Sequence, residues 1–335
     1  MNILPSQEQQ EILSVIESFL SGELPVTRYR DIGPDAGVYD NALWQQLVEL
    51  GWFGIAAPEH VGGSGLSLAD EMMIYYEAGK QLISPSVLAT SMAVKLAIQL
   101  EDFPLAEALI GGQTRVALAN VVSLTVDGST ATGELQLFDA NNADLILAIT
   151  TEQLVLIDSK ALHIESQPAM DASSTLDKTV FSGVDANVVS ADSGNIGRQL
   201  QVLICAQLAG ITSATMDMAV EYAKEREQFG QAIGAFQAIQ HICADMFVFT
   251  EASHQQTVMG CLALHEERED ADTQLASAVL ICMKAADHNC RQNIQIHGGM
   301  GFTMECSAHL FLKRAYVYET LLKNISDVEA TLLSR

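Results

Sequence analysis

The chain has 335 residues, a mean hydropathy of +0.19 and a formal net charge of −25 at pH 7. So negative a surface repels nucleic acid and anionic membranes, and we expect neither as a partner. Hydrophobic residues make up 49 % of the chain, yet no uninterrupted apolar run reaches the roughly 18 residues that would span a membrane. The apolar excess is therefore expected in buried helices and subunit interfaces.

The chain's six cysteines form no CxxC pair and do not have the spacing of a zinc site. They are expected to be free thiols, and no metal site is predicted. The first ten residues are polar and lack the apolar segment of a signal peptide. This pattern predicts a cytoplasmic location.

Residues 1–113 are predicted to form an all-α domain. Ser6, followed three residues later by Gln9, has the pattern of a capping box at the start of the first helix. Prolines mark two further helix starts. The other helices of this domain are expected at Asn41–Leu50, at Leu68–Gln81, and from Pro85 and Pro104 onward.

Residues 114–192 change character and are predicted to form a middle β domain. Short runs rich in β-branched and aliphatic residues alternate with turn signals such as Asp127-Gly128. We expect antiparallel strands, which need no crossover helices. The expected strands are Val116–Asn120, Thr130–Phe138, Leu145–Thr150, Leu154–Ile157 and Thr179–Phe181.

Residues 193–335 return to helical periodicity and are predicted to form a C-terminal four-helix bundle. Long apolar helices joined by short turns are typical of antiparallel bundles. The helices are expected near 197–229, 235–267, 270–297 and 304–322, with a short last one near 326–334. The fold class is therefore multidomain α and β, with a helical domain, a β domain and a helical bundle in that order.

Two segments of the bundle contain residue types that suit a phosphate ligand. Arg226 lies near the end of a helix predicted to run to Phe229 and to be closed by Gly230, and its guanidinium can donate a fork of hydrogen bonds to a diphosphate. Gly298 and Gly299 follow another long helix and would let a phosphate approach the backbone. From these residues alone, a subunit interface without any ligand is the favoured interpretation.

Three segments resemble signatures of the acyl-CoA dehydrogenase family and occur in the family's order. They are LGWFGIAAPEHVGGSGLSL (Leu50–Leu68), EYAKEREQFGQAIGAFQAIQHICADM (Glu221–Met246) and QIHGGMGFTMECSAHLFLKRA (Gln295–Ala315). The order of helical, β and helical domains is also similar to that family. The chain is identified as a short member of it.

The resemblance implies that the chain binds FAD across a subunit boundary. It assigns one set of residues to the FAD of a neighbouring subunit and a second set to the adenosine-diphosphate portion. The first set is Arg226, Gln228, Phe229, Ile233, Phe236 and Gln237, and the second is Gln295, Gly298 and Gly299.

The resemblance also implies the reaction, which is α,β-dehydrogenation of an acyl-CoA thioester. In the family a glutamate removes an α-proton while the β-hydrogen leaves as hydride to flavin N5. An electron-transferring flavoprotein is the expected electron acceptor. The expected assembly is a homodimer or homotetramer, or a heterotetramer with a homologous subunit.

The usual glutamate base is not found where the resemblance leads us to expect it. Gap-free alignment puts Leu322 at one family position of the base, and Gln207 stands at the position used by other short members. A neutral amide is not a general base near pH 7. Glu319, about one helical turn before Leu322, is the best remaining candidate.

The β domain departs from the family as well. Its first strand, within Val116–Gly128, lacks the Thr-Glu-Pro-Gly-like segment that supports the flavin ring in the family. Two hypotheses therefore remain open. One is an active FAD-dependent acyl-CoA dehydrogenase with Glu319 as a relocated base, and the other is a non-catalytic partner subunit of a heteromeric acyl-CoA dehydrogenase.

Overall fold

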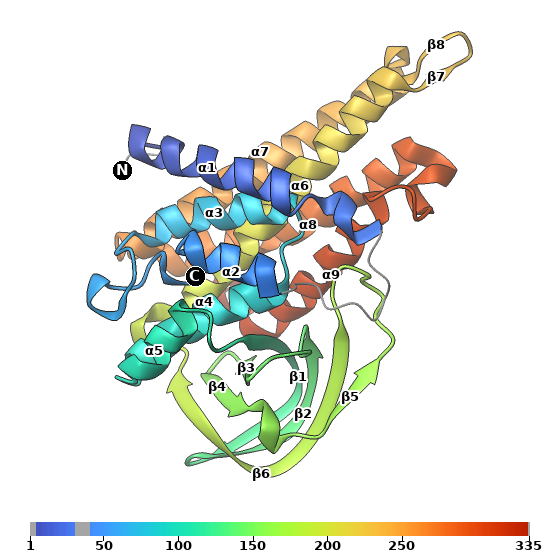
Figure 1. The fold of residues 1–335 in the computed structure, drawn as a ribbon. Helices are drawn as coiled ribbons and strands as arrows, with labels where there is room; N and C mark the ends of the chain where they lie inside the picture. Colours follow the sequence, from blue (N-terminus) through green and yellow to red (C-terminus); the bar gives the residue numbers. More distant parts are fainter. Residues whose placement is uncertain (1–4, 31–40, 334–335) are drawn as a thin grey trace.

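The N-terminal region is a layer of helices packed against the C-terminal bundle (Figure 1). The computed structural model describes residues 5–30 and 41–333. The helices of this region are α1 (Gln7–Glu23), α2 (Asn41–Glu49), α3 (Leu68–Lys80), α4 (Pro85–Gln99) and α5 (Phe103–Ile110).

The predicted helix starts in this region are confirmed. The Ser6 side chain accepts from the backbone N–H of Gln9, and the Gln9 side chain accepts from the backbone N–H of Ser6, so the capping box is complete. Pro85 opens α4, where its missing N–H costs no helical hydrogen bond. Both features are local, which explains why sequence reasoning found them.

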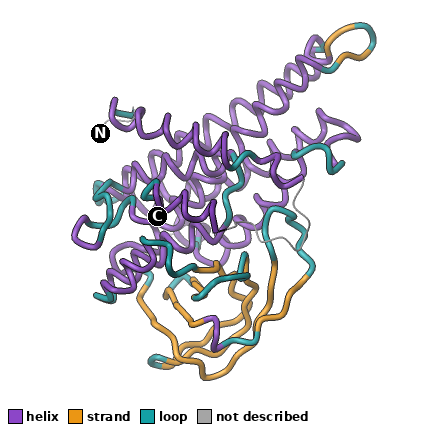
Figure 2. Tube along the Cα trace, in the orientation of Figure 1, coloured by secondary structure: helices purple, strands orange, loops and turns teal. Residues whose placement is uncertain are grey.

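The middle region is a strongly curved sheet that closes on itself (Figure 2). Its strand order is β2-β1-β3-β4-β6-β5, and an additional β2–β6 pairing closes the sheet. The strands are β1 (Val116–Asp127), β2 (Thr130–Phe138), β3 (Leu145–Ile149), β4 (Gln153–Asp158), β5 (Ile164–Gln167) and β6 (Leu176–Ser190). Inward residues of these strands form an apolar core of their own.

Two expectations for this sheet are corrected by the structure. The expectation of purely antiparallel strands is wrong, because β3 pairs with β1 in parallel, on the edge of β1 opposite to β2. Strand β5 was not predicted, because its sequence Ile-Glu-Ser-Gln is polar and largely exposed and shows no apolar alternation.

The C-terminal region has four long helices and a short final one. They are α6 (Ile196–Glu225), α7 (Gln237–His265), α8 (Ala271–His297), α9 (Ala308–Ile325) and α10 (Val328–Leu333). Residues 193–225, which include α6, are long and apolar enough to pass a membrane-span test, but 78 % of the tested window is buried inside the protein. The apolar character of α6 is thus accounted for by its place at the centre of the bundle, and the predicted order of the three regions is confirmed.

The first bundle helix ends earlier than the sequence suggested, so the predicted run to Phe229 is wrong. Arg226 already has extended backbone angles, and a short hairpin follows, formed by β7 (Glu227–Gln228) and β8 (Gln231–Ala232). Phe229 and Gly230 form its two-residue turn with φ of 56° and 81°. Positive φ at both central residues is the geometry of a type I′ hairpin turn.

Helices α3 and α6 cross so closely that only glycine fits at the contact. A Cβ added at Gly210 would lie 2.0 Å from the carbonyl oxygen of Tyr76, and one added at Gly79 would lie 2.2 Å from that of Gln207. These contacts are with backbone atoms, which cannot rotate away as a side chain can. The crossing therefore fixes the depth at which Gln207 sits in the core.

Replacing Gly210 with Ala is expected to lower the free energy of unfolding by about 1–3 kcal/mol or more, because the helices must separate to admit the methyl group. The matched control is Gly22→Ala, since a Cβ at Gly22 in α1 would meet nothing within 4 Å. That control should raise the stability by up to about 1 kcal/mol through helix propensity. Urea denaturation of both variants measures the difference, and equal stabilities would contradict the tight crossing.

Candidate functional site

The predicted cofactor-binding residues gather at one end of the bundle. The β7–β8 hairpin prolongs α6 and α7 beyond the rest of the molecule, at the upper right of Figure 1. Nearby, α8 ends at His297 and leads into the turn that begins with Gly298. The rings of Tyr222 in α6 and His297 stack with centroids 4.2 Å apart, so the ends of α6 and α8 are held side by side.

Phe229 at the hairpin tip is an unusual residue for its conformation. Its φ of 56° is in the left-handed region, which costs a non-glycine residue roughly 1–2 kcal/mol. Its side chain is 93 % exposed, and its only ring contact in the described part of the chain is an edge-on approach to Phe236 at 6.2 Å. A strained and exposed aromatic ring suits contact with a group outside this chain.

The turn at Gly298 and Gly299 is open to the approach of a ligand. Gly298 has φ of 61°, which favours glycine, and a Cβ at either position would meet nothing within 4 Å. Met300, Phe302 and Met304 follow directly, with 45 %, 71 % and 60 % of their surfaces exposed. The turn therefore offers accessible backbone flanked by exposed apolar side chains.

Arg226 adds a positive charge to this end of a strongly acidic protein. It is exposed, and its guanidinium makes no ion pair with any residue that the structure describes. Gln228, Gln237 and Gln295 are exposed at the same end, whereas Ile233 and Phe236 are half-buried. A basic group and open glycine backbone at the same end of the bundle are the residue types that would suit the diphosphate portion of FAD.

The two positions where the resemblance places a catalytic base are closed. Gln207 in α6 and Leu322 in α9 are both 0 % exposed. The Gln207 side-chain oxygen accepts a hydrogen bond from the Tyr318 hydroxyl, and its Nε2 is buried without a partner among the described residues. Neither position presents an ionisable group to solvent or ligand.

Glu319, the candidate base named from the sequence, lies on the outer part of α9. Its carboxylate pairs with Lys323 at 2.6 Å, one helical turn further along, and 26 % of its side chain is exposed. The neighbouring Tyr318 is the residue that points into the core. Glu319 therefore has the contacts of a surface ion pair of the kind common on helices.

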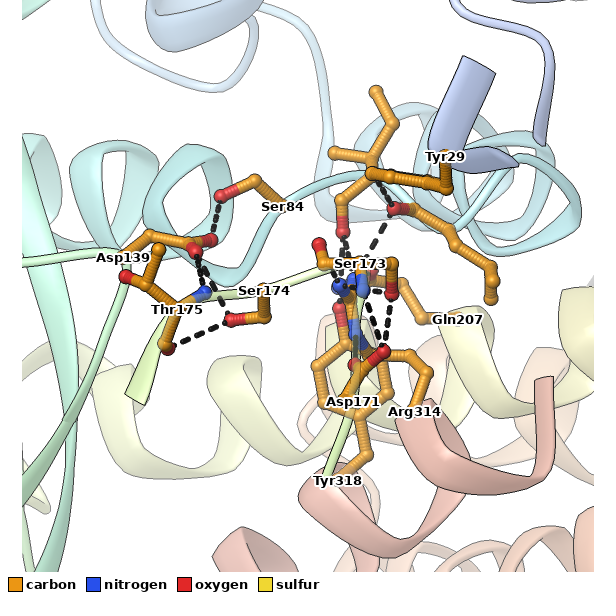
Figure 3. A network of polar contacts seen from close by, with 12 residues as sticks. Tyr29, Ser84, Asp139, Asp171, Ser173, Ser174, Thr175, Gln207, Arg314 and Tyr318 are labelled. Carbon is orange, nitrogen blue, oxygen red and sulfur yellow. Dashed lines mark hydrogen bonds and ion pairs between the residues drawn. The ribbon is translucent and has the colours of Figure 1, made fainter. Parts of the chain in front are cut away.

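Sequence reasoning missed a buried polar network centred on Arg314 (Figure 3). Arg314 is 0 % exposed, and its Nε donates to Asp171 Oδ2 at 2.8 Å. The remaining nitrogens donate to the carbonyl oxygens of Ile83 and Ser173 at 2.6 and 2.7 Å. Burial acts to lower the pKa of Arg314, but Asp171, together with Tyr318, Tyr29 and Asp139, more than offsets this, and the pKa stands well above its usual value.

A second buried carboxylate belongs to the same region. Asp139 accepts hydrogen bonds from the hydroxyls of Ser84 and Ser174 and from the backbone N–H of Thr175. Burial raises the pKa of Asp139 even though these donors and the Arg314 charge favour the ionised form. The connection between β5 and β6 is thus pinned at Asp171 by Arg314 and at Thr175 by Asp139.

Comparison with protein families identifies the class of protein. Residues 6–103 match the acyl-CoA dehydrogenase N-terminal domain, and residues 198–322 match the acyl-CoA dehydrogenase C-terminal domain. This chain belongs to the acyl-CoA dehydrogenase family.

Individual relatives agree with this assignment. The chain is 32 % identical over 279 residues to acyl-CoA dehydrogenase FadE34 of Mycobacterium tuberculosis, covering 81 % of this chain but 38 % of that longer relative. It is 28 % identical over 326 residues to acyl-CoA dehydrogenase IpdE2 of the same organism, covering 97 % and 96 % of the two chains. Among solved structures, the ChsE4-ChsE5 complex from M. tuberculosis matches with a TM-score of 0.84 at 18 % identity, covering 100 % of this chain and 97 % of the matched one.

Replacing Arg314 with Met should be strongly destabilising, because it leaves the Asp171 carboxylate buried without its cation. Loss of one partner of a buried ion pair typically costs about 3–5 kcal/mol. Adding Asp171→Leu should recover part of this loss, although the Ile83 and Ser173 carbonyls still lack their donor. Guanidinium denaturation of both variants tests this, and a single variant as stable as the wild type would show that the pair contributes nothing.

Proposed function

We propose that this chain is the non-catalytic subunit of a heteromeric acyl-CoA dehydrogenase. Its bundle end would contact an FAD that is bound by a homologous subunit. The observation that carries the proposal is the pair of family base positions, Gln207 and Leu322, which hold uncharged and fully buried side chains. A proton-abstracting base must be ionisable and reach its substrate, and neither residue meets either requirement.

The bundle end supports the second half of the proposal. Arg226, Gly298 and Gly299 retain what a diphosphate needs, namely a cation without an ionic partner among the described residues and open glycine backbone. The ends of α6 and α7 and the β7–β8 hairpin that joins them project from the molecule on the side away from its β domain (Figure 1). They are thus suited to reach a cofactor seated in another chain, with Phe229, Ile233, Phe236, Gln228, Gln237 and Gln295 around it.

The first strand of the β domain also supports a non-catalytic role for this chain. Strand β1 begins the segment that departs from the family's flavin-supporting sequence. Its first five residues are all buried in the core. The polar residue among these five, Asn120, is engaged inside the chain, where its side chain donates to Gln136 and accepts from Asn324. When bound, FAD would supply the hydride acceptor, and an electron-transferring flavoprotein would take up the electrons. The structurally similar ChsE4-ChsE5 is a complex of two proteins, which fits a heteromeric assembly.

Replacing Arg226 with Met should weaken FAD retention by the assembled complex by roughly 10–100-fold, the value of a charge-assisted hydrogen bond to an anion. The matched control is Lys160→Met, which removes an exposed cation from the β domain and should leave retention unchanged. Flavin absorbance of the complex after gel filtration is the measurement. The isolated chain should be colourless, and a chain that purified alone with one FAD and oxidised acyl-CoA would overturn the proposal.

The alternative function is catalysis by this chain with Glu319 as the base. Its support is the position of Glu319 directly after Tyr318, whose hydroxyl reaches Gln207. Under our proposal, Glu319→Gln removes only the surface pair with Lys323, and turnover of the complex should stay within about twofold. A general base contributes about 10²–10⁴-fold, so a loss of that size in steady-state turnover would favour the alternative.

A further inference from the structure

A small pocket lies between the β domain and α9. Its free volume is about 160 Å³, which is below the roughly 300–1,000 Å³ of usual ligand sites. Phe138, Leu176 and Val317 provide apolar walls, and Met170 at the rim is 65 % exposed. The pocket can take a short apolar group, but it is too small for an acyl chain together with the reacting thioester.

The inner wall of this pocket is the buried ion pair. Asp171 lines the pocket, and directly behind it lies the Arg314 guanidinium, 2.8 Å from the Asp171 carboxylate. Arg314 is held from the other side by the carbonyl oxygens of Leu82 and Ile83. Every group in this wall is therefore fixed by hydrogen bonds rather than by loose packing.

Behind the wall lies the position of the missing base. The carbon of the Arg314 guanidinium is 5.9 Å from the centre of the Tyr318 ring, and the Tyr318 hydroxyl donates to Gln207. The path from the pocket to Gln207 thus runs through Asp171, Arg314 and Tyr318 (Figure 3). An acyl α-carbon next to a base at position 207 would need the volume that these side chains fill.

We infer that the Asp171–Arg314 ion pair is a specificity-determining wall that closes this chain to acyl thioesters. The inference rests on the proposed function and goes beyond it, since the chain then lacks the acyl cavity as well as the base. The ion pair does not open to admit a ligand. Displacing one partner leaves a buried unpaired charge, which would weaken any ligand that did so by about 100-fold or more.

The test compares two double variants of the isolated, flavin-free chain. Arg314→Ala with Asp171→Ala removes both charges and opens the volume behind the pocket. Arg314→Met with Asp171→Leu removes the same charges but refills that volume. We expect hexanoyl-CoA to bind the opened variant at least about tenfold more tightly than the refilled variant or the wild type, as measured by titration calorimetry and by the shift in melting temperature.

The outcomes separate this inference from the proposed function, because no flavin or turnover enters the measurement. Two results would contradict the inference that the Asp171–Arg314 ion pair blocks acyl binding. One is equal binding by the opened and refilled variants, and the other is no binding by an opened variant that circular dichroism shows to be folded. Should the opened variant fail to fold, the wild-type chain still decides the matter. One-to-one binding of hexanoyl-CoA by the wild type would refute a closed cavity, and an absence of binding that persists in Tyr318→Phe, with Arg314 still in place, would support it.

Discussion

The buried charge of Arg314 is the constraint around which the interior of this protein is arranged. A guanidinium without solvent needs an anion and acceptors for its remaining donors, and the chain supplies these from two segments distant in sequence. Asp171 and Ser173 come from the β5–β6 connection, and the carbonyls of Leu82 and Ile83 come from the turn between α3 and α4. One side chain of α9 thereby joins all three regions of the fold, and each depends on the others for its position.

The buried interior around Arg314 and the exposed bundle end differ in how their charged groups are paired. Every nitrogen of the Arg314 guanidinium donates to an acceptor inside the protein, so this charge is not available to recognise a ligand. At the bundle end, Arg226 and Phe229 are exposed, and Gly298 leaves its backbone uncovered. On a chain of net charge −25, an exposed cation of this kind is available for an anion brought by another molecule.

How much could be foreseen from the sequence depended on the range of the signal. Helical periodicity, the Ser6 capping box and the Pro85 helix start are local, and they gave the order of helical and β regions. The short hairpin after Arg226 was missed because its two-residue strands have no apolar alternation and its turn uses Phe-Gly rather than the common Asn-Gly.

The Arg314 network had no such signal. Arg314 and Asp171 are 143 residues apart, and no periodic pattern links them. The available hint was a charged residue within the apolar run of α9, which suggests burial with a partner but does not say which acid provides it. The family signatures pointed to residues that gather at the bundle end, because those residues are contiguous in sequence and distinctive as a group.

The amide at position 207 and the ion pair at Arg314 are best understood as one electrostatic arrangement. The buried region holds one guanidinium, with Asp171 as its direct partner and Asp139 as a further negative group nearby. A glutamate at position 207 would add another carboxylate to this closed volume, where desolvation disfavours the ionised form. Gln207 instead offers Tyr318 a neutral acceptor at no cost in buried charge, so the proposed absence of a base and the proposed closed cavity are mutually consistent.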